Sequence, residues 1–232
     1  MFICKNILKN RNSHKYKHIQ KVILQLKKRK EEIPYSEFGS GSVWNKRKIQ
    51  TVGSVIRTSG LPAKYGKVLF NLVAYYKFTH ILELGTSVGT STLYMSMAYP
   101  DSKVLTIEGS KERAEFASDL FNQMGMSNIE VHIGNFTEEL DVILRNRVKF
   151  DLVFIDGDHT EKAVLKNFYH LHHHLHEKSI VILDDIHLSS SMERAWRKIL
   201  RDDKVTLTID LFRLGIIFFD TKLSKQNLII NY

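Results

Sequence analysis

From residue 79 onward, short runs rich in Ile, Val and Leu alternate with segments of helical pattern, and this alternation constrains the fold more than any other feature. The apolar runs occupy 79–84, 103–108, 128–133, 151–156 and 179–184, with helices expected at 89–98, 111–124, 137–147 and 161–176. Such an alternation is typical of a parallel sheet that helices cover on both faces. A helix near 190–202 precedes two further apolar runs, 205–212 and 214–220, which predict a closing antiparallel hairpin.

The first 78 residues follow a different, mainly helical pattern. Helices are expected at 14–31, ended by Pro34, and near 45–58 and 62–77, with a flexible turn at 39–42. We therefore expect two segments: a basic N-terminal arm and helical cap over 1–78, and an α/β domain over 79–232.

The net charge of +9 belongs to this arm. The first 30 residues hold ten Lys and Arg side chains and no acidic ones, so the rest of the chain is nearly neutral. Two interpretations stay open: a solvated amphipathic helix, which we favour, or a contact with a polyphosphate or an anionic lipid surface.

Several classes of protein are excluded or disfavoured. No apolar run approaches the length of a membrane-spanning helix, and the first residues lack the features of a secretory signal. The single cysteine, Cys4, cannot form an internal disulfide or a paired-cysteine metal site. These features lead us to expect a cytoplasmic protein.

Ligands of such sheets bind beyond the carboxyl ends of the strands, where the chain carries two informative patterns. Gly85 and Gly89 lie in the turn after the first strand, where a glycine lets the backbone approach a ligand. Ser87 and Thr90 replace the later glycines of a dinucleotide fingerprint, so a nicotinamide oxidoreductase is disfavoured. Glu108 ends the second strand, where a carboxylate can bind the two hydroxyls of a ribose; the alternative is an acidic residue that merely precedes a helix.

The segments ELGTSVGTS, TIEGS, FDLVFIDGDH and VILDD together resemble the class I S-adenosylmethionine-dependent methyltransferases. The resemblance covers residues 79–220 and implies a Rossmann-like, doubly wound sheet, mostly parallel, behind an N-terminal helical cap. It also implies the residues that bind the cofactor. Those expected around its methionine part are Glu83, Gly85, Thr86, Ser87 and Gly89, with Glu108 at the ribose and Gly134, Asn135 and Phe136 near the adenine.

The ends of the fourth and fifth strands indicate the chemistry. The proline-containing loop of amino methyltransferases is absent, and IDGDH stands in its place, which disfavours methylation of an amine. Asp156, Asp184 and Asp185 are expected at one sheet edge, where their mutual repulsion calls for a neutralising group such as Mg²⁺. This arrangement resembles the catechol and caffeoyl-coenzyme A O-methyltransferases, although their fifth strand commonly ends in Asp-Asn, and related sugar and antibiotic enzymes have Asp-Asp. The alternative is a strand-end turn, with Asp158 as a helix cap.

The resemblance also suggests a general base. The catechol branch has a lysine three positions after the first metal-binding Asp, and His159 stands there, so His159 beside Asp156 is the expected catalytic pair. His187 and Asp158 are the competing candidates, and either histidine could instead be a polar residue at the edge of the site.

Two other features have structural interpretations. We expect the five histidines of residues 170–176 to form a solvated helix face rather than a metal site. Met192 and Trp196 could cover an apolar acceptor or pack on the sheet.

The sequence therefore predicts a methyltransferase that uses S-adenosylmethionine and Mg²⁺ to methylate the oxygen of a small hydroxylated molecule. An RNA-modifying methyltransferase that uses the basic arm, and a non-catalytic module that binds the cofactor, are the alternatives. A homodimer is compatible with the sequence, which does not identify the acceptor.

Overall fold

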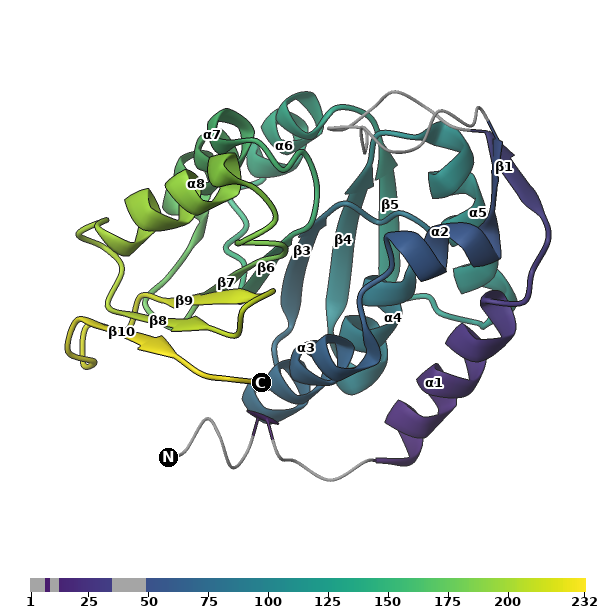
Figure 1. Cartoon of the computed structure of the whole chain (residues 1–232), viewed down its shortest axis with the longest axis horizontal. Helices are drawn as coiled ribbons and strands as arrows, with labels where there is room; N and C mark the ends of the chain where they lie inside the picture. Colours follow the sequence, from purple (N-terminus) through teal and green to yellow (C-terminus); the bar gives the residue numbers. More distant parts are fainter. Residues whose placement is uncertain (1–6, 9–12, 35–48) are drawn as a thin grey trace.

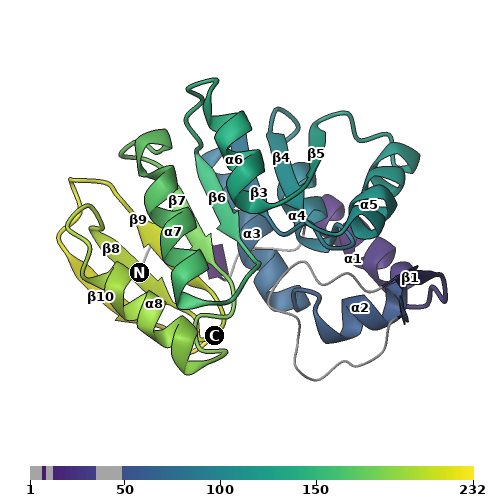
Figure 2. The ribbon, with the colours of Figure 1, turned by 90° about the horizontal axis from the view of Figure 1, so that it is seen from above.

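The computed structural model of the chain describes residues 7–8, 13–34 and 49–232; the turn expected at 39–42 lies outside these ranges. Its centre is an eight-stranded sheet in the order β10-β8-β9-β7-β6-β3-β4-β5, which Figure 2 shows with β10 at one end and β5 at the other. The strands are β3 His80–Leu84, β4 Lys103–Glu108, β5 Ile129–Ile133, β6 Leu152–Ile155, β7 Ile180–Leu183, β8 Leu207–Asp210, β9 Gly215–Phe218 and β10 Gln226–Ile229. Within this sheet of the described residues, β9 alone is antiparallel to both of its neighbours, β7 and β8. The mostly parallel sheet with a closing hairpin is confirmed.

Helices cover both faces of this sheet (Figure 1). Those on one face are α1 His14–Leu26, α2 Val52–Thr58, α3 Ala63–Tyr76, α4 Thr90–Ala98 and α5 Lys111–Gln123; those on the other are α6 Phe136–Leu144, α7 Glu161–Leu171 and α8 Ser190–Leu200. Successive strand residues serve opposite faces, so Ile81 packs with the first set and Leu82 with the second. No helix in the described ranges has the length and apolar content needed to cross a membrane.

The N-terminal segment differs from the expected pattern in two places. Helix α1 ends at Leu26 rather than near residue 31, because the next position of its buried stripe is Lys30, in a run of four basic residues. Residues 32–34 form strand β1, which contains Pro34 and pairs with β2 (Ile49–Thr51). Of the helix expected at 45–58, residues 45–48 lie outside the described ranges, and residues 49–51 belong to β2. The described helix begins at Val52, where the hydroxyl of Thr51 caps it by accepting a hydrogen bond from the Ser54 amide.

Strand β10 and the end of α7 also differ from expectation. The sequence pattern does not predict a strand at 226–229, because an exposed strand needs no apolar run. Strand β10 forms there by pairing in parallel with β8. Helix α7 ends at Leu171 instead of residue 176, and residues 172–174 form a single tighter turn.

The order of the strands fixes where a ligand can bind. The chain passes from β3 to β4 and β5 on one side and then returns to β6 on the other side of β3. Helical connections leave β3 and β6 in opposite directions at this point, and ligands of such sheets bind in the crevice outside the carboxyl ends of those strands.

Candidate active site

The turn after β3 lies directly against the end of β6. The amide of Asp156 donates to the carbonyl of Leu84, and the amide of Gly85 donates to that of Ile107. A Cβ on Gly85, whose φ is +109°, would lie 2.0 Å from the carbonyl oxygen of Asp156. Only glycine fits at this position, and its absence of a side chain lets the two strand ends meet.

The same turn leads into α4 without any side-chain cap. Gly89 has a φ of +84° and precedes the first residue of α4, and the first turn of that helix carries no acidic side chain. A Cβ on Gly89 would lie 2.7 Å from the ring of Phe121, so this position also requires glycine. The first amides of α4 are therefore available to an anionic group of a ligand.

Glu108, at the tip of β4, is held by two backbone amides. Its Oε2 accepts a 2.7 Å hydrogen bond from the amide of Ser87, and its Oε1 accepts one of 2.9 Å from the amide of Ser110. The residue is 7% exposed. A carboxylate oxygen has more than one lone pair, so Glu108 keeps acceptor capacity for a ligand while its orientation is fixed.

Two other residues of the expected cofactor site lie beneath this turn. Glu83 and Thr86 are buried, and the hydroxyl of Thr106 joins them: it donates to Oε2 of Glu83 at 2.7 Å and lies 2.5 Å from Oγ1 of Thr86. Thr92 of α4 also donates to Oε2 of Glu83. Burial raises the pKa of Glu83, although the hydrogen bonds from the hydroxyls of Thr92 and Thr106 act to lower it. This arrangement supports the turn from below, and direct contact of Glu83 or Thr86 with a cofactor stays a prediction.

The loop after β5 reaches the same edge of the sheet. The amide of Gly134 donates to the carbonyl of Glu108, and Asn135 caps α6 by accepting from the amide of Thr137. The ring of Phe136 lies so close to Gly157 that a Cβ there would be 2.7 Å from it. Gly134, Asn135 and Phe136 thus stand between the ends of β4 and β6.

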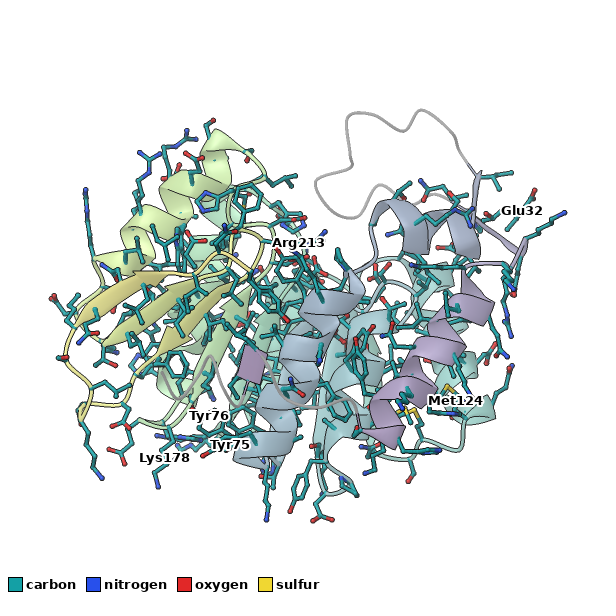
Figure 3. The ribbon with its side chains drawn as sticks, turned by 60° about the horizontal axis from the view of Figure 1, so that its bottom comes forward. Glu32, Tyr75, Tyr76, Met124, Lys178 and Arg213 are labelled. Atoms are coloured by element: carbon teal, nitrogen blue, oxygen red, sulfur yellow. The ribbon has the colours of Figure 1, made fainter. Side chains whose placement is uncertain are left out.

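The three aspartates expected at one edge do meet there, together with an arginine that the sequence analysis did not assign. Arg213, in the turn between β8 and β9, donates from Nε and Nη2 to the two oxygens of Asp184 at 2.8 and 2.7 Å. Its Nε is also 3.3 Å from Oδ1 of Asp185. On the other side of the cluster, Nε2 of His159 lies 3.7 Å from Oδ1 of Asp156. Figure 3 labels Arg213 near the middle of the molecule.

The charges of this cluster act on one another. Burial, and then the charges of Asp184 and Asp185, raise the pKa of Asp156 well above its usual range. Burial would lower the pKa of Arg213, but the hydrogen bonds and charge of Asp184 outweigh burial and raise it. Arg213 is therefore always charged, and burial beside two other aspartates favours the neutral form of Asp156.

The arrangement does not fit a bound Mg²⁺. In the part of the chain that the structure describes, no group of three or more His, Cys, Asp or Glu side chains is placed to hold a metal ion. Asp184 is fully buried, and both of its oxygens accept from the guanidinium of Arg213, whose positive charge opposes a second cation there. Asp156 and Asp185 are left as candidate oxygen ligands. Mg²⁺ demands near-ideal octahedral geometry, which two carboxylates beside a guanidinium do not supply.

The two competing candidate bases are hydrogen-bonded to other side chains. His187 donates or accepts at Nε2 with Oδ2 of Asp210 at 2.8 Å, and its ring lies 5.7 Å from that of Phe212. Asp158 has a φ of +45° and accepts from the hydroxyl of Thr160, which is the cap of α7. Both residues shape loops beside the site, whereas His159 faces Asp156.

The histidine run is not the solvated helix face that the sequence predicts. Of these histidines only His173 is exposed and the other four are partly buried, since α7 ends at Leu171 and the chain turns back toward the sheet. His176 binds Asp151 at 3.0 Å, and His172 packs edge-on against Phe168. These residues pack around the end of α7.

Met192 and Trp196 lie inside the protein, at 1% and 4% exposure. A Cβ on Gly215 would lie 2.7 Å from the ring of Trp196. They pack on the sheet and do not form an acceptor surface.

Backbone strain gathers at this edge of the sheet. Six described residues other than glycine have positive φ, and four of them, Ser87, Asp158, Asp185 and Phe212, lie in loops at the carboxyl ends of the strands. Such conformations cost roughly 1–3 kcal/mol each and are typical of functional sites.

Arg213 carried one sequence signal, a single charge between the apolar runs of the closing hairpin. Its partners lie 28 and 29 positions earlier in the chain, so only the pairing of β7 with β9 brings them together.

Comparison with known proteins agrees with this geometry. Residues 82–186 match the sequence model of a family described as a methyltransferase domain. Catechol O-methyltransferase of Niastella koreensis is 31% identical over 108 residues, which are 43% of this chain and 49% of that protein. Ribosomal RNA small subunit methyltransferase G of Lachnoclostridium phytofermentans is 33% identical over 73 residues, 32% of this chain and 30% of that protein. The chain thus spans less than half the length of these relatives.

A solved structure shares the fold. The O-methyltransferase TomG of Streptomyces achromogenes, in complex with S-adenosylmethionine, aligns with a TM-score of 0.62 at 22% identity, over 69% of this chain and 82% of that one. The matched domain contains the glycine turn, Glu108 and all three aspartates of the cluster.

Proposed function

We propose that this chain, whose residues 82–186 match the sequence model of a methyltransferase domain, is an S-adenosylmethionine-dependent O-methyltransferase that acts on a small hydroxylated molecule. The observation that carries the proposal is Glu108, a nearly buried carboxylate that the amides of Ser87 and Ser110 hold at the strand tip beside the glycine turn. A carboxylate fixed in this way suits the paired hydroxyls of a ribose.

The residues present fit the cofactor. Gly85, Ser87 and Gly89 give its methionine part a close backbone approach, and the uncapped first turn of α4 suits its carboxylate. Glu108 takes the ribose hydroxyls, and Gly134, Asn135 and Phe136 flank the adenine. The bound cofactor supplies an electrophilic methyl group, and the chain aligns the acceptor and removes its proton.

The proton of the acceptor hydroxyl passes to the imidazole of His159. Oδ1 of Asp156 lies 3.7 Å from Nε2 of His159 and positions the imidazole to accept this proton. A bound cofactor would supply the methyl group, and the chain would have to hold the acceptor oxygen in line with it.

The substrate class is open to direct test. Incubation of the protein with S-adenosylmethionine and pools of hydroxylated metabolites, followed by mass spectrometry, should show a product heavier than its acceptor by one CH₂ unit. Turnover of no acceptor despite tight binding of S-adenosylhomocysteine would leave a non-catalytic cofactor-binding module. Methylation of RNA that is sensitive to salt and lost on deletion of residues 1–30 would favour the RNA-modifying alternative.

A further inference from the structure

The guanidinium of Arg213 already supplies a positive charge to the aspartates at the strand ends. Asp184 is fully buried, and its two oxygens receive two parallel N–H donors from Arg213. Such a bidentate pair is short, directional and roughly twice as strong as a neutral hydrogen bond. Arg213 itself is only partly exposed, at 22% of its side chain.

We propose that Arg213 is a built-in cation, which neutralises the Asp156, Asp184 and Asp185 cluster in place of a bound divalent ion and holds these residues in position for methyl transfer. The inference rests on the proposed function and deepens it. It makes the transfer independent of metal, in contrast to the sequence-based expectation of Mg²⁺.

Hydrogen bonds fix the backbone on both sides of Arg213, as expected if the guanidinium stays in place. The carbonyl of Arg213 accepts from the amide of Ile186, and the amide of Leu211 donates to the carbonyl of Leu214 to close the turn. Phe212, with a φ of +72°, donates its amide to Oδ1 of Asp210. The hairpin thus holds the guanidinium against the loop that follows β7.

A divalent ion held by all three aspartates would have to displace this guanidinium. It would compete for both oxygens of Asp184 and would leave a partly buried arginine without its partner, which is strongly destabilising. Removal of the guanidinium should have the opposite effect, because three carboxylates without a counter-charge attract a hard cation.

Binding of Mn²⁺ alone, followed by electron paramagnetic resonance, tests the proposal on the full chain with S-adenosylhomocysteine present. We expect the natural protein to bind Mn²⁺ only weakly. Arg213→Gln should bind it at least tenfold more tightly, and Mg²⁺ should raise the Tm of this variant but not that of the natural protein. Arg201→Gln, an exposed arginine at the end of α8, is the matched control and should behave like the natural protein.

Two further variants separate neutralisation from folding. Arg213→Lys keeps the positive charge and should gain no Mn²⁺ affinity, whereas Asp184→Asn in the Arg213→Gln background should abolish the gain. Tight Mn²⁺ binding by the natural protein that Asp156→Asn weakens would overturn the proposal, even if Arg213→Gln does not fold. Failure to bind S-adenosylhomocysteine would instead contradict the proposed function and would leave the Mn²⁺ result unaffected.

Discussion

The amide of Ser87 donates a 2.7 Å hydrogen bond to Oε2 of Glu108. This bond ties the turn after β3 to the tip of β4, and Ser87 takes a left-handed conformation, with a φ of +49°, to make it. The geometry of the glycine turn and the orientation of the carboxylate therefore depend on each other.

Glu108→Ala should weaken the binding of S-adenosylhomocysteine by about tenfold or more, because it removes charge-assisted hydrogen bonds to the ribose. Isothermal titration calorimetry measures the effect. Glu115→Ala, an exposed position on α5, is the control and should leave the affinity unchanged. An unaltered affinity in Glu108→Ala would remove this carboxylate from the cofactor site.

Gly85→Ala should lower the free energy of unfolding by about 2–4 kcal/mol, since its Cβ would collide with the carbonyl of Asp156 and its φ is positive. Gly125→Ala is the matched control: φ is +68° there, but no atom lies within 4 Å of the new Cβ. The control should lose only about 1–2 kcal/mol. Equal losses of unfolding free energy in the two variants, measured by urea denaturation, would show that the close approach of Gly85 to Asp156 does not contribute to stability.

His159→Ala should reduce kcat strongly with the acceptor that the metabolite screen identifies, while the affinity for S-adenosylhomocysteine stays unchanged. His159→Lys should retain part of the activity, because an amine can also accept the proton. His187→Ala is the comparison, and its rate should stay near that of the natural protein. A loss of activity in His187→Ala with a fully active His159→Ala would transfer the role of base to His187.

The sequence predicted the sheet because each of its central strands is buried on both faces and therefore apolar along its whole length. It also predicted Glu108 and the aspartates, since residues that directly follow such runs share one edge. It did not predict the pairing of Arg213 with Asp184, which depends on the register of Leu183 opposite Gly215. Nor did it predict β10, because an exposed edge strand needs no apolar pattern.

His172 should make the protein less stable in mild acid. Burial lowers the pKa of its imidazole below the ordinary value of 6.5; the charge of Asp202 opposes this shift, and those of Lys204 and His173 add to it. The unfolded chain then binds the proton more readily than the folded one. Stability is therefore full above about pH 6.5 and is lost as the pH falls through the lowered folded pKa.

Substitution isolates this effect. Nε2 of His172 is buried and makes no hydrogen bond to the described residues, and its ring lies against Phe168 and Phe219. His172→Phe should raise the free energy of unfolding by roughly 1 kcal/mol or more and reduce its dependence on pH between 7.5 and 5. His173→Gln, at the exposed neighbour, should change neither quantity. Urea midpoints at several pH values decide the matter, and an unchanged pH dependence in His172→Phe would refute it.

Phe212 offers a test of whether the strained hairpin serves the acceptor. Phe212 is 74% exposed, follows β8 directly before Arg213, and its ring lies near that of His187. Its φ of +72° is costly for any residue but glycine. Phe212→Gly should relieve this strain and stabilise the fold by about 1 kcal/mol. It should also raise the KM for the acceptor several-fold, because an exposed aromatic ring beside the aspartate cluster would pack on an apolar part of that molecule.

Lys77→Gly is the matched control for this variant. Lys77 has a φ of +54° at the end of α3. This helix end lies near the amino ends of the strands, far from Arg213, as the labels of its neighbours Tyr75 and Tyr76 in Figure 3 show. It should gain similar stability without any change in KM. If Phe212→Gly is stabilised and keeps the KM of the natural protein, the ring has no part in binding the acceptor. A rise in KM confined to Phe212→Gly would mean that the hairpin retains a strained aromatic residue because the acceptor binds to it.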